Sequence, residues 1–552
     1  MNTALSALTS RIVYALLILL LFFAATVYRL SAPGAPFIDA DIRGYLKPEL
    51  LALTHEGFQS IDGRSFVYPG FIYIILSLFP NFHAITTVQH LLGVAAGGVL
   101  LAAWNCSRRL VKAPMTPVAF YRLLGIPVAG LYLFNTNTFR FEHSIRPEAI
   151  FPFLAALSML FNIEFIRHKW LKPNPAATLL LGSLNLFTAF LLFFLKPSFF
   201  LATCPCLLPV CISLFDKREP RVYRLLLVAV AVICIPVFFF FPEQHFHKDD
   251  LSAKAFLPTT LFVIHANVIR DQILSDIKTN ARTPYPTPFL QRTFNLLDQE
   301  IGISRRTGKY KSLGYDPDYL MYADSFNRKF STYWDPGDAR DAQIRFYYYY
   351  FCRAWTHQPA RMLSKVLTQI TLFYNSMGGI SPYKTDKQVV VGERYKHNIT
   401  DVDLAHLFLP IDYTPLREFM MESKQLTDNT YKISQPVVVS LLGAVLQRTF
   451  TLCFVFGIGM AILIAKNRTL RNNYGWFTAA LMLFYTYSFA NNLGIAFIHS
   501  LEVARYSTNQ LIYCLLPHTM TIWLAVEIFL LRSTGASPQQ SGVLKNHAHI
   551  AG

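Results

Sequence analysis

The hydrophobic pattern of this chain is a series of long apolar runs separated by short polar stretches. Several runs hold about twenty residues, the length that an α-helix needs to cross roughly 30 Å of hydrocarbon. The predicted fold class is therefore an all-α polytopic membrane protein. The pattern predicts ten membrane-spanning helices, which cover residues 13–27, 84–104, 124–134, 149–165, 178–195, 199–215, 225–241, 437–464, 476–489 and 510–531.

Three other apolar stretches are better explained as helices at the membrane surface. Residues 68–79 span only twelve positions, and runs of that length are more often interfacial or re-entrant than membrane-spanning. Residues 256–268 and 360–374 lie in a long polar segment, which they would seat on the membrane. If residues 360–374 were counted as a span, the basic stretch 466–471 would lie on the extracytoplasmic side of the membrane.

The long polar segment divides the chain into three parts. Residues 1–241 form an N-terminal transmembrane module with catalytic outer loops, residues 242–435 an extracytoplasmic domain, and residues 436–552 a C-terminal transmembrane module with a cytoplasmic tail. The middle part shows no sustained alternation of polar and apolar positions, and it contains Pro- and Gly-rich turns. It is therefore predicted to be a mostly helical insertion.

The charge pattern gives the orientation. The formal charge is +17, from 50 Lys and Arg against 33 Asp and Glu. With both termini inside, every strongly basic short loop falls on the cytoplasmic side, as the positive-inside rule requires. The positive charge is thus explained without nucleic acid, and membrane lipids with anionic head groups are the expected partners.

The residues able to carry out chemistry gather on the outer side. Charges beside apolar spans on one face favour a substrate site. Arg binds phosphate bidentately, Lys acts as a point charge, and a carboxylate can accept a proton from an attacking hydroxyl. The mixture suits a phosphate-bearing ligand. The candidates are Asp39, Asp41 and Arg64 of the first loop, Arg146 and Glu148 of the second, Lys196 of a tight turn, and Glu502, Arg505 and Tyr506 before the last span.

Each candidate also has a purely structural explanation. Asp39 is a suitable helix cap, and Arg146 and Lys196 are suited to lie at the membrane interface with their apolar stems buried. Arg505-Tyr506 could anchor the last span, and Glu148 could pair with Arg146.

The order of these motifs resembles the GT-C superfamily of membrane glycosyltransferases, above all the aminoarabinose-transferase and protein O-mannosyltransferase type. Asp41-Ile-Arg-Gly-Tyr45 after the first span is similar to their Asp-x-x-x-Tyr, and Arg64-Ser-Phe-Val-Tyr68-Pro69-Gly70 fits their next block. Arg146-Pro147-Glu148 and Glu502-Val-Ala-Arg505-Tyr506 resemble later motifs. The resemblance covers residues 1–240 and the last 60, not the outer segment. Such enzymes carry Asp-Glu where this chain has Asp41-Ile42, so Asp39 is the candidate second acid.

The resemblance implies transfer of a monosaccharide from a polyprenyl-phosphate donor to a hydroxyl of an envelope glycan, lipid or protein. Asp41 would be the general base, with Asp39 assisting it or binding a metal. The donor phosphate would contact Arg505, Lys196 and Arg64, whereas Arg146 and Glu148 would shape the sugar and acceptor pocket. A divalent cation (Mg²⁺ or Mn²⁺) on the Asp-x-Asp pair and the Lys and Arg side chains are alternative ways to balance the phosphate charge.

Three other function classes remain open, one of which is a non-catalytic assembly protein whose large outer segment binds partners. A ligase or polymerase that moves a whole glycan from a lipid pyrophosphate would use the same residues. A transporter of lipid-linked glycans would be expected to show inverted repeats and charges near the midplane, and the sequence shows neither. Of the eight cysteines only Cys352 lies in the outer segment, which therefore cannot hold an internal disulfide. We expect the bacterial inner membrane, with a periplasmic active site, rather than the endoplasmic reticulum.

Overall fold

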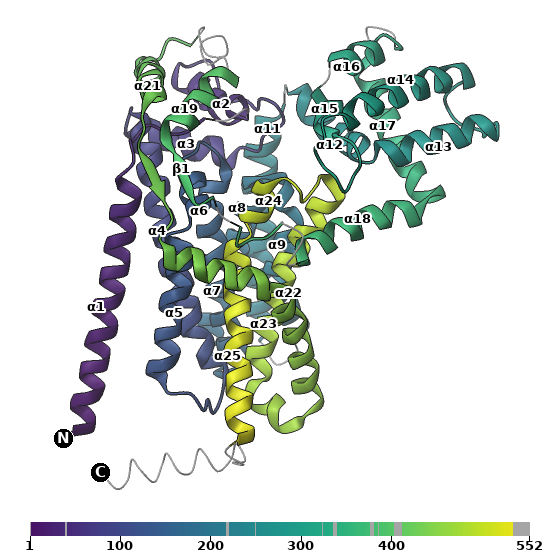
Figure 1. Ribbon diagram of the computed structural model, residues 1–552. Coiled ribbons are helices and arrows are strands. Elements are labelled where there is room, and N and C mark those ends of the chain that lie inside the picture. Colours follow the sequence, from purple (N-terminus) through teal and green to yellow (C-terminus); the bar gives the residue numbers. More distant parts are fainter. Residues whose placement is uncertain are drawn as a thin grey trace.

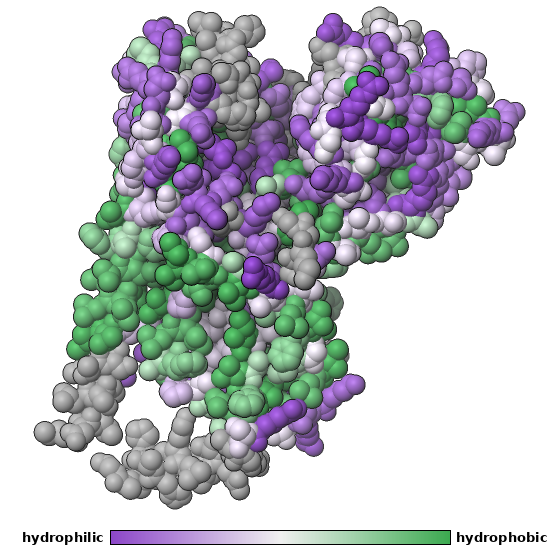
Figure 2. All heavy atoms as spheres, in the orientation of Figure 1, coloured by the Kyte–Doolittle hydropathy of each residue, from purple (hydrophilic) through white to green (hydrophobic). Residues whose placement is uncertain are grey.

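Helices make up 79% of the chain, with almost no sheet, which confirms the predicted all-α class. The computed structural model describes residues 2–38, 41–216, 220–248, 250–322, 324–334, 339–375, 380–384, 386–401 and 411–533. A bundle of long helices fills the lower half of Figure 1, and two groups of shorter elements stand on one end of it. Hydrophobic residues cover much of the face of the bundle seen in Figure 2, as expected of an integral membrane protein.

Within the described chain, seven helical stretches are long and apolar enough to cross a membrane. Helices suit this position because all their backbone polar groups are paired internally, where lipid offers no partners. The stretches are Arg11–Leu30, Phe82–Leu110, Pro175–Leu195, Arg221–Phe246, Val437–Lys466, Arg468–Ile498 and Leu511–Ser533. The first stretch is the larger part of α1 (Asn2–Leu30). The others correspond, in order, to α4 (Phe82–Ser107) with η1 (Arg108–Leu110), α8 (Pro175–Leu195), α10 (Arg221–Ile235) with η5 (Pro236–Glu243) and α11 (Gln244–Phe246), α22 (Val437–Lys466), α23 (Arg468–Ile498) and α25 (Leu511–Ser533).

The sequence predicted ten spans, and length and composition support seven, or eight if a bent pair counts as one span. The bent pair is α5 (Val118–Leu133) with α6 (Thr136–Glu142), which meet at 56°. The other two predicted spans correspond to α7 (Phe151–Ile166) and α9 (Phe200–Phe215), which have sixteen residues each. Both lie within the bundle (Figure 1), and α7 packs against α4 and α8. Short turns flank them: η2 (Pro147–Ala149), η3 (Arg167–Leu171) and η4 (Pro197–Phe199).

One end of the bundle carries the shorter elements. Helices α2 (Ile42–Leu53) and α3 (Val67–Leu78) pack against each other there. Helix α3 is apolar and only twelve residues long, in agreement with the short, non-spanning helix predicted at 68–79. α1 begins and α25 ends at the opposite end (Figure 1).

The segment predicted as one outer domain, residues 242–435, falls into two parts. Its first part is a helical lobe with its own hydrophobic core, in which Phe262 and Tyr347 stack with ring centroids 4.3 Å apart. The lobe is on the right in Figure 1. It consists of α12 (Leu251–Ile264), α13 (Ala266–Lys278), α14 (Thr287–Arg305), α15 (Pro317–Tyr322), α16 (Asp324–Ser331), α17 (Ala339–His357) and α18 (Pro359–Tyr374).

The second part folds back onto the first loops of the chain and shares the main hydrophobic core. Strands β1 (Gln388–Val390) and β2 (Lys432–Ser434) pair antiparallel, with Val389 opposite Ile433. The Tyr395 hydroxyl donates a hydrogen bond to the Ala35 carbonyl, so this part fixes the loop that follows α1. The remaining helices are α19 (Val391–Asp401), α21 (Thr414–Gln425) and η6 (Leu426–Asp428).

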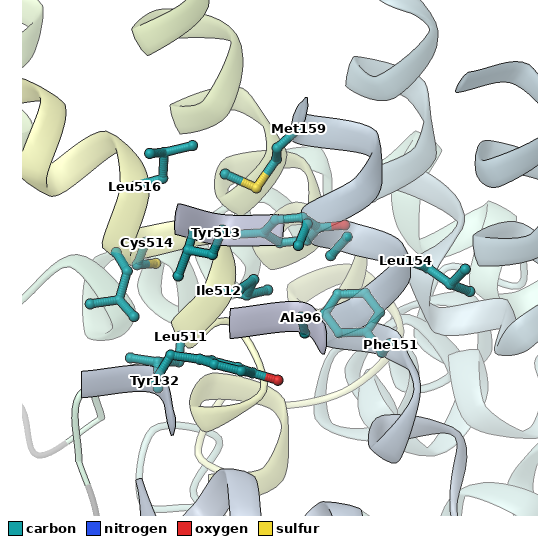
Figure 3. Packing of buried hydrophobic residues seen from close by; sticks show 14 of the residues in the cluster. Ala96, Tyr132, Phe151, Leu154, Met159, Leu511, Ile512, Tyr513, Cys514 and Leu516 are labelled. Carbon is teal, nitrogen blue, oxygen red and sulfur yellow. The ribbon is translucent and has the colours of Figure 1, made fainter. Parts of the chain in front are cut away.

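The main core lies directly beneath the outer loops. Figure 3 shows Phe151 at the start of α7 close to Tyr513 of α25, and their ring centroids are 5.3 Å apart in an edge-to-face arrangement. Tyr132 of α5 and Leu511 of α25 pack at the same level. Phe151 follows shortly after Glu148, and Leu511 follows shortly after Arg505. This packing therefore fixes the position, relative to the core, of the loops that carry Glu148 and Arg505.

Candidate active site

Asp41 lies at the centre of a group of charged side chains from five separate segments. It precedes the first turn of α2, and its Oδ1 accepts a hydrogen bond from Arg64 Nη2 at 2.8 Å. Its Oδ2 accepts another from Arg505 Nη1 at 2.8 Å, and Arg146 Nη2 lies 3.7 Å from the same oxygen. The Asp41 side chain is only 18% exposed. Three guanidinium groups therefore converge on one nearly buried carboxylate.

A second ion pair lies beside the first. Lys196, directly after α8, places Nζ 2.5 Å from Glu148 Oε1, and both side chains are buried. Arg146 connects the two carboxylates, since its Nε lies 3.6 Å from Glu148 Oε2. We call the six side chains the ion cluster: Asp41, Arg64, Arg146, Glu148, Lys196 and Arg505.

The ion cluster carries more positive than negative charge. Four of its side chains are cations and two are anions, so its formal charge is +2. A group of cations in a poorly solvated site attracts anions, so a negatively charged ligand would be stabilised there. Arg and Lys are the side chains that bind phosphate, by paired hydrogen bonds and by point charge respectively.

The cations keep both acids ionised. Burial alone would raise the pKa of the Asp41 carboxyl, but the cations, led by Arg64 and Arg505, hold that pKa well below its usual range. Burial likewise opposes ionisation of Glu148, and Lys196 followed by Arg146 lowers the Glu148 pKa to about 2. For Lys196 the cost of burial is outweighed by Glu148, which raises the Lys196 pKa above its ordinary value.

Aromatic rings cover the cations. The Arg64 guanidinium lies 4.8 Å from the centroid of Tyr45, and the Tyr506 ring lies 5.4 Å from Lys196 Nζ and 5.2 Å from the Arg505 guanidinium. Such rings attract cations through their π electrons and exclude water. Tyr506, predicted from sequence, is thus a wall of the cluster.

Glu502, also predicted as a substrate-binding residue, lies outside the ion cluster. Its carboxylate accepts hydrogen bonds from the Ser312 hydroxyl at 2.5 Å and the Ser312 amide at 3.2 Å. Gln369 of α18 donates to the same hydroxyl and accepts from the Leu501 amide at 2.8 Å. The observed contacts of Glu502 therefore join the helical lobe to the loop that carries Arg505.

The lobe contributes residues that the sequence did not single out as site residues. Asp318 lies 3.5 Å from His499 and accepts a hydrogen bond from the Tyr310 hydroxyl. The Phe256 ring centroid lies 5.6 Å from the Arg64 guanidinium. The local sequence does not place these residues at the site, because they are far from Arg64 and Arg505 along the chain. Asp316-Pro-Asp318 has the Asp-x-Asp form, but its sequence is typical of a turn.

The predicted metal site is only partly within the described chain, since Asp39 lies outside it. Elsewhere in the described ranges, no group of three or more His, Cys, Asp and Glu side chains could hold a metal ion. Both oxygens of Asp41 accept from guanidinium groups, and four cations surround it. The metal site at Asp39 and Asp41 therefore stays a prediction, and the proposal below uses no metal.

A narrow cavity reaches Glu148 from the direction of the bundle. It lies between α5, α6 and the start of α25, and Phe141, Pro152 and Thr508 contribute to its walls. Three polar atoms of its lining residues, Tyr132 Oη, Glu148 Oε2 and Asn509 Oδ1, are buried without a hydrogen-bond partner in the described chain. Buried polar atoms normally have such partners, so this cavity is suited to a polar group.

Comparisons of the chain with protein-family models, with curated proteins and with solved structures gave no match.

Proposed function

We propose that this chain is a membrane glycosyltransferase of the GT-C kind. It would transfer a monosaccharide from a polyprenyl-phosphate donor to a hydroxyl of a cell-envelope glycan, lipid or protein. The observation that carries the proposal is the contact of Asp41 with Arg64 and Arg505 inside a cluster of net positive charge at one end of the bundle. The resemblance of the sequence motifs to that superfamily supports the same reaction.

The charge of the ion cluster suits the leaving group of this reaction. A sugar phosphodiester carries one negative charge, and breaking its bond to the sugar leaves a phosphate monoester with a charge of about −1.5 to −2 at pH 7. A cluster of +2 therefore matches the departing phosphate better than it matches the donor. Such a preference lowers the barrier, because only interactions that strengthen towards the transition state accelerate the reaction.

Asp41 is the proposed general base. The acceptor oxygen forms a bond to the anomeric carbon of the sugar, the bond from that carbon to the phosphate oxygen breaks, and the acceptor proton passes to Asp41. A carboxylate held by two guanidinium groups is a weak base. Donor phosphate would compete for Arg64 and Arg505, which leaves Asp41 more basic at the moment it is needed.

The position of the cluster supports a defined orientation. It lies at the end of the bundle opposite the start of α1 and the end of α25 (Figure 1). With both termini in the cytoplasm, the site would face the periplasm of a bacterial inner membrane. Polyprenyl chains of the donor would then lie along the outer leaflet, with the phosphate at the level of Arg505 and Lys196.

The test is transfer from a panel of radiolabelled polyprenyl-phosphate sugars to a membrane glycan extract by the purified protein. Wild type is compared with Asp41→Asn and with Asp62→Asn, which removes an exposed carboxylate of the same loop. We expect transfer by wild type and Asp62→Asn, and a loss of at least a hundredfold in Asp41→Asn at equal folding, with no effect of EDTA. Equal transfer by all three proteins would reject Asp41 as the base.

A second candidate is a ligase or polymerase that uses a lipid pyrophosphate. The observation in its favour is the number of cations, since four suit the greater charge of a pyrophosphate. The same assay with a pyrophosphate-linked glycan distinguishes the two. Transfer of the whole glycan, with none from the monophosphate panel, would replace our proposal. Donor binding without any transfer would favour a transporter of lipid-linked glycans.

A further inference from the structure

A second buried group of ionisable side chains lies below the ion cluster and takes no part in it. Arg29 at the end of α1 is paired with Glu142 at the end of α6, with Nε to Oε2 at 2.7 Å and Nη2 to Oε1 at 3.1 Å. His90 of α4 places Nδ1 3.0 Å from the same Oε2, and its Nε2 lies 3.1 Å from His143 Nδ1. All four side chains are at most 2% exposed.

The series of hydrogen bonds from Glu142 to Ala35 determines how many protons the two imidazole rings hold. His143 Nε2 lies 2.9 Å from the Ala35 carbonyl oxygen, which can only accept. At the other end, the Glu142 carboxylate accepts from Arg29 through both of its oxygens and is the acceptor for His90. The three contacts from Glu142 through His90 and His143 to Ala35 therefore need three ring protons, and two neutral imidazoles supply only two. One further proton is required.

Of the two rings, only His90 contacts the Glu142 carboxylate, so we place the extra proton on His90 and take His143 as the neutral ring. It then donates from Nε2 to Ala35 and accepts at Nδ1. His90 must donate from both nitrogens, which makes it the imidazolium. The Phe139 ring lies against both imidazoles, with centroids 5.1 Å from His90 and 5.3 Å from His143.

The surroundings suit one extra positive charge. Helices α1, α5 and α6 all end here, and helix C-termini carry partial negative charge that stabilises cations. Arg29 also donates to the carbonyl of Leu133, the last residue of α5. Gly93, one turn after His90, has no side chain, and a Cβ there would overlap the Glu142 carboxylate.

The remaining ionisable groups near the pair do not remove the need for this proton. The only ionisable residue of the neighbouring α7 is Glu164, which pairs with Arg167 at the far end of that helix. The others around the pair are Tyr28 of α1, Tyr68 of α3, His83 of α4, Tyr132 of α5, Tyr395 of α19 and Glu422 of α21, the last held by His83 at 2.6 Å.

His143 joins this group to the ion cluster through the backbone. Its carbonyl accepts from the Phe37 amide at 2.7 Å, and the Ile145 amide donates to the Phe37 carbonyl at 3.1 Å. These bonds fix the loop before Asp41 against the loop before Arg146. The register of the two loops sets the distance between Asp41 and Arg146.

We propose that His90 and His143 form a buried pair that holds one extra proton, and that this proton locks the first outer loop against the second. Both histidines are positioning residues, since neither touches the ion cluster. The proton itself is independent of the proposed glycosyl transfer, whereas its effect on the site depends on that function. Loss of the proton at high pH would leave His90 Nε2 and His143 Nδ1 facing each other as two acceptors. Their repulsion would loosen the contact of His143 with Ala35.

The first measurement is ¹⁵N NMR of the full-length protein labelled at histidine, at pH 8. An ordinary histidine has a pKa of about 6.5 and is almost entirely neutral there. We expect an imidazolium signal that disappears in His90→Gln and persists in His83→Gln, which removes a more exposed histidine that also faces a carboxylate. Absence of an imidazolium signal in wild type, or its persistence in His90→Gln, would overturn the proposal.

Glu142→Gln supplies a second variant. Its amide can donate to His90 Nδ1, so the three contacts are satisfied by two neutral rings and the imidazolium should vanish. In the transfer assay, wild-type activity should fall about tenfold per pH unit above the titration of the pair, and Glu142→Gln should remove that dependence. A pH profile unchanged in Glu142→Gln would refute the positioning role. Absence of all transfer in wild type would refute the proposed function and leave the NMR result to decide on the proton.

Discussion

Asp41 and Arg505 are 464 positions apart in the sequence, yet Oδ2 of the first lies 2.8 Å from Nη1 of the second. The contact joins the two ends of the chain across the outer surface of the bundle. The Arg505 loop is in turn held by Glu502 and Ser312, which belongs to the helical lobe. The position of one guanidinium group therefore depends on three distant segments.

Arg505→Lys should weaken donor binding. The substitution keeps the positive charge but loses the planar fork that binds two oxygens at once. A hydrogen bond to a charged group contributes about 1.5–3 kcal/mol, so we expect the KM for the donor to rise about ten- to hundredfold with a smaller change in kcat. The measurement is steady-state transfer kinetics. Arg417→Lys, at an exposed pair with Asp412, is the control and should behave as wild type.

Glu148 and Lys196 should be strongly coupled in stability. Removing one partner of a buried ion pair leaves an uncompensated charge and costs about 3–5 kcal/mol. Glu148→Gln and Lys196→Met should each show such a loss, and the double variant should lose clearly less than the two losses combined. Chemical unfolding in detergent measures all three. The exposed pair of Arg417 and Asp412 serves as the control, with a coupling of about 0–1 kcal/mol. Additive losses at Glu148 and Lys196 would contradict the observed pairing.

The ion cluster should make stability fall in acid. The folded-state pKa of Glu148 is about 2, against 4.5 for an ordinary glutamate. A depressed carboxyl pKa stabilises the fold at pH values above the unfolded pKa, and this stabilisation is lost as the pH falls through the folded pKa. We therefore expect the Tm to decrease between about pH 4.5 and pH 2. Thermal scans of wild type and Glu148→Gln test this, and a decrease of equal size in the variant would exclude Glu148 as a cause.

Two glycines of α4 should respond in opposite ways to alanine. A Cβ at Gly93 would overlap the Glu142 carboxylate, so Gly93→Ala should displace that side chain and lower the Tm markedly. A Cβ at Gly98 would lie 3.6 Å from Phe22, an ordinary contact. Gly98→Ala should be neutral or stabilise by up to about 1 kcal/mol, because it reduces the freedom of the unfolded chain. Equal effects of both substitutions would argue against the close contact of α4 with Glu142.

The sequence predicted the elements better than their contacts. Apolar length located the spans, and twelve residues sufficed to identify α3 as too short to cross. Of the site, Asp41, Arg64, Arg146, Glu148, Lys196 and Arg505 were all identified, because charges beside apolar spans are costly and conspicuous. The pairing of Lys196 with Glu148 could not be derived, since it depends on how α7 and α8 pack. His90 carries no such signal, as a single histidine within an apolar run, and the pattern does not show that it meets His143 of the second loop.

The contact between Glu148 and Lys196 also constrains how the chain is threaded. Glu148 precedes α7 and Lys196 follows α8, and the two meet at the same surface. A path that leaves a surface and returns to it must traverse the layer an even number of times. Since α8 is long enough to cross, α7 is the first half of that round trip, and together with the π-helical turn η3 it covers 21 residues. Because α1 begins and α25 ends at the same end of the bundle, an even number of traverses is expected, as the count of eight that includes the bent pair would give.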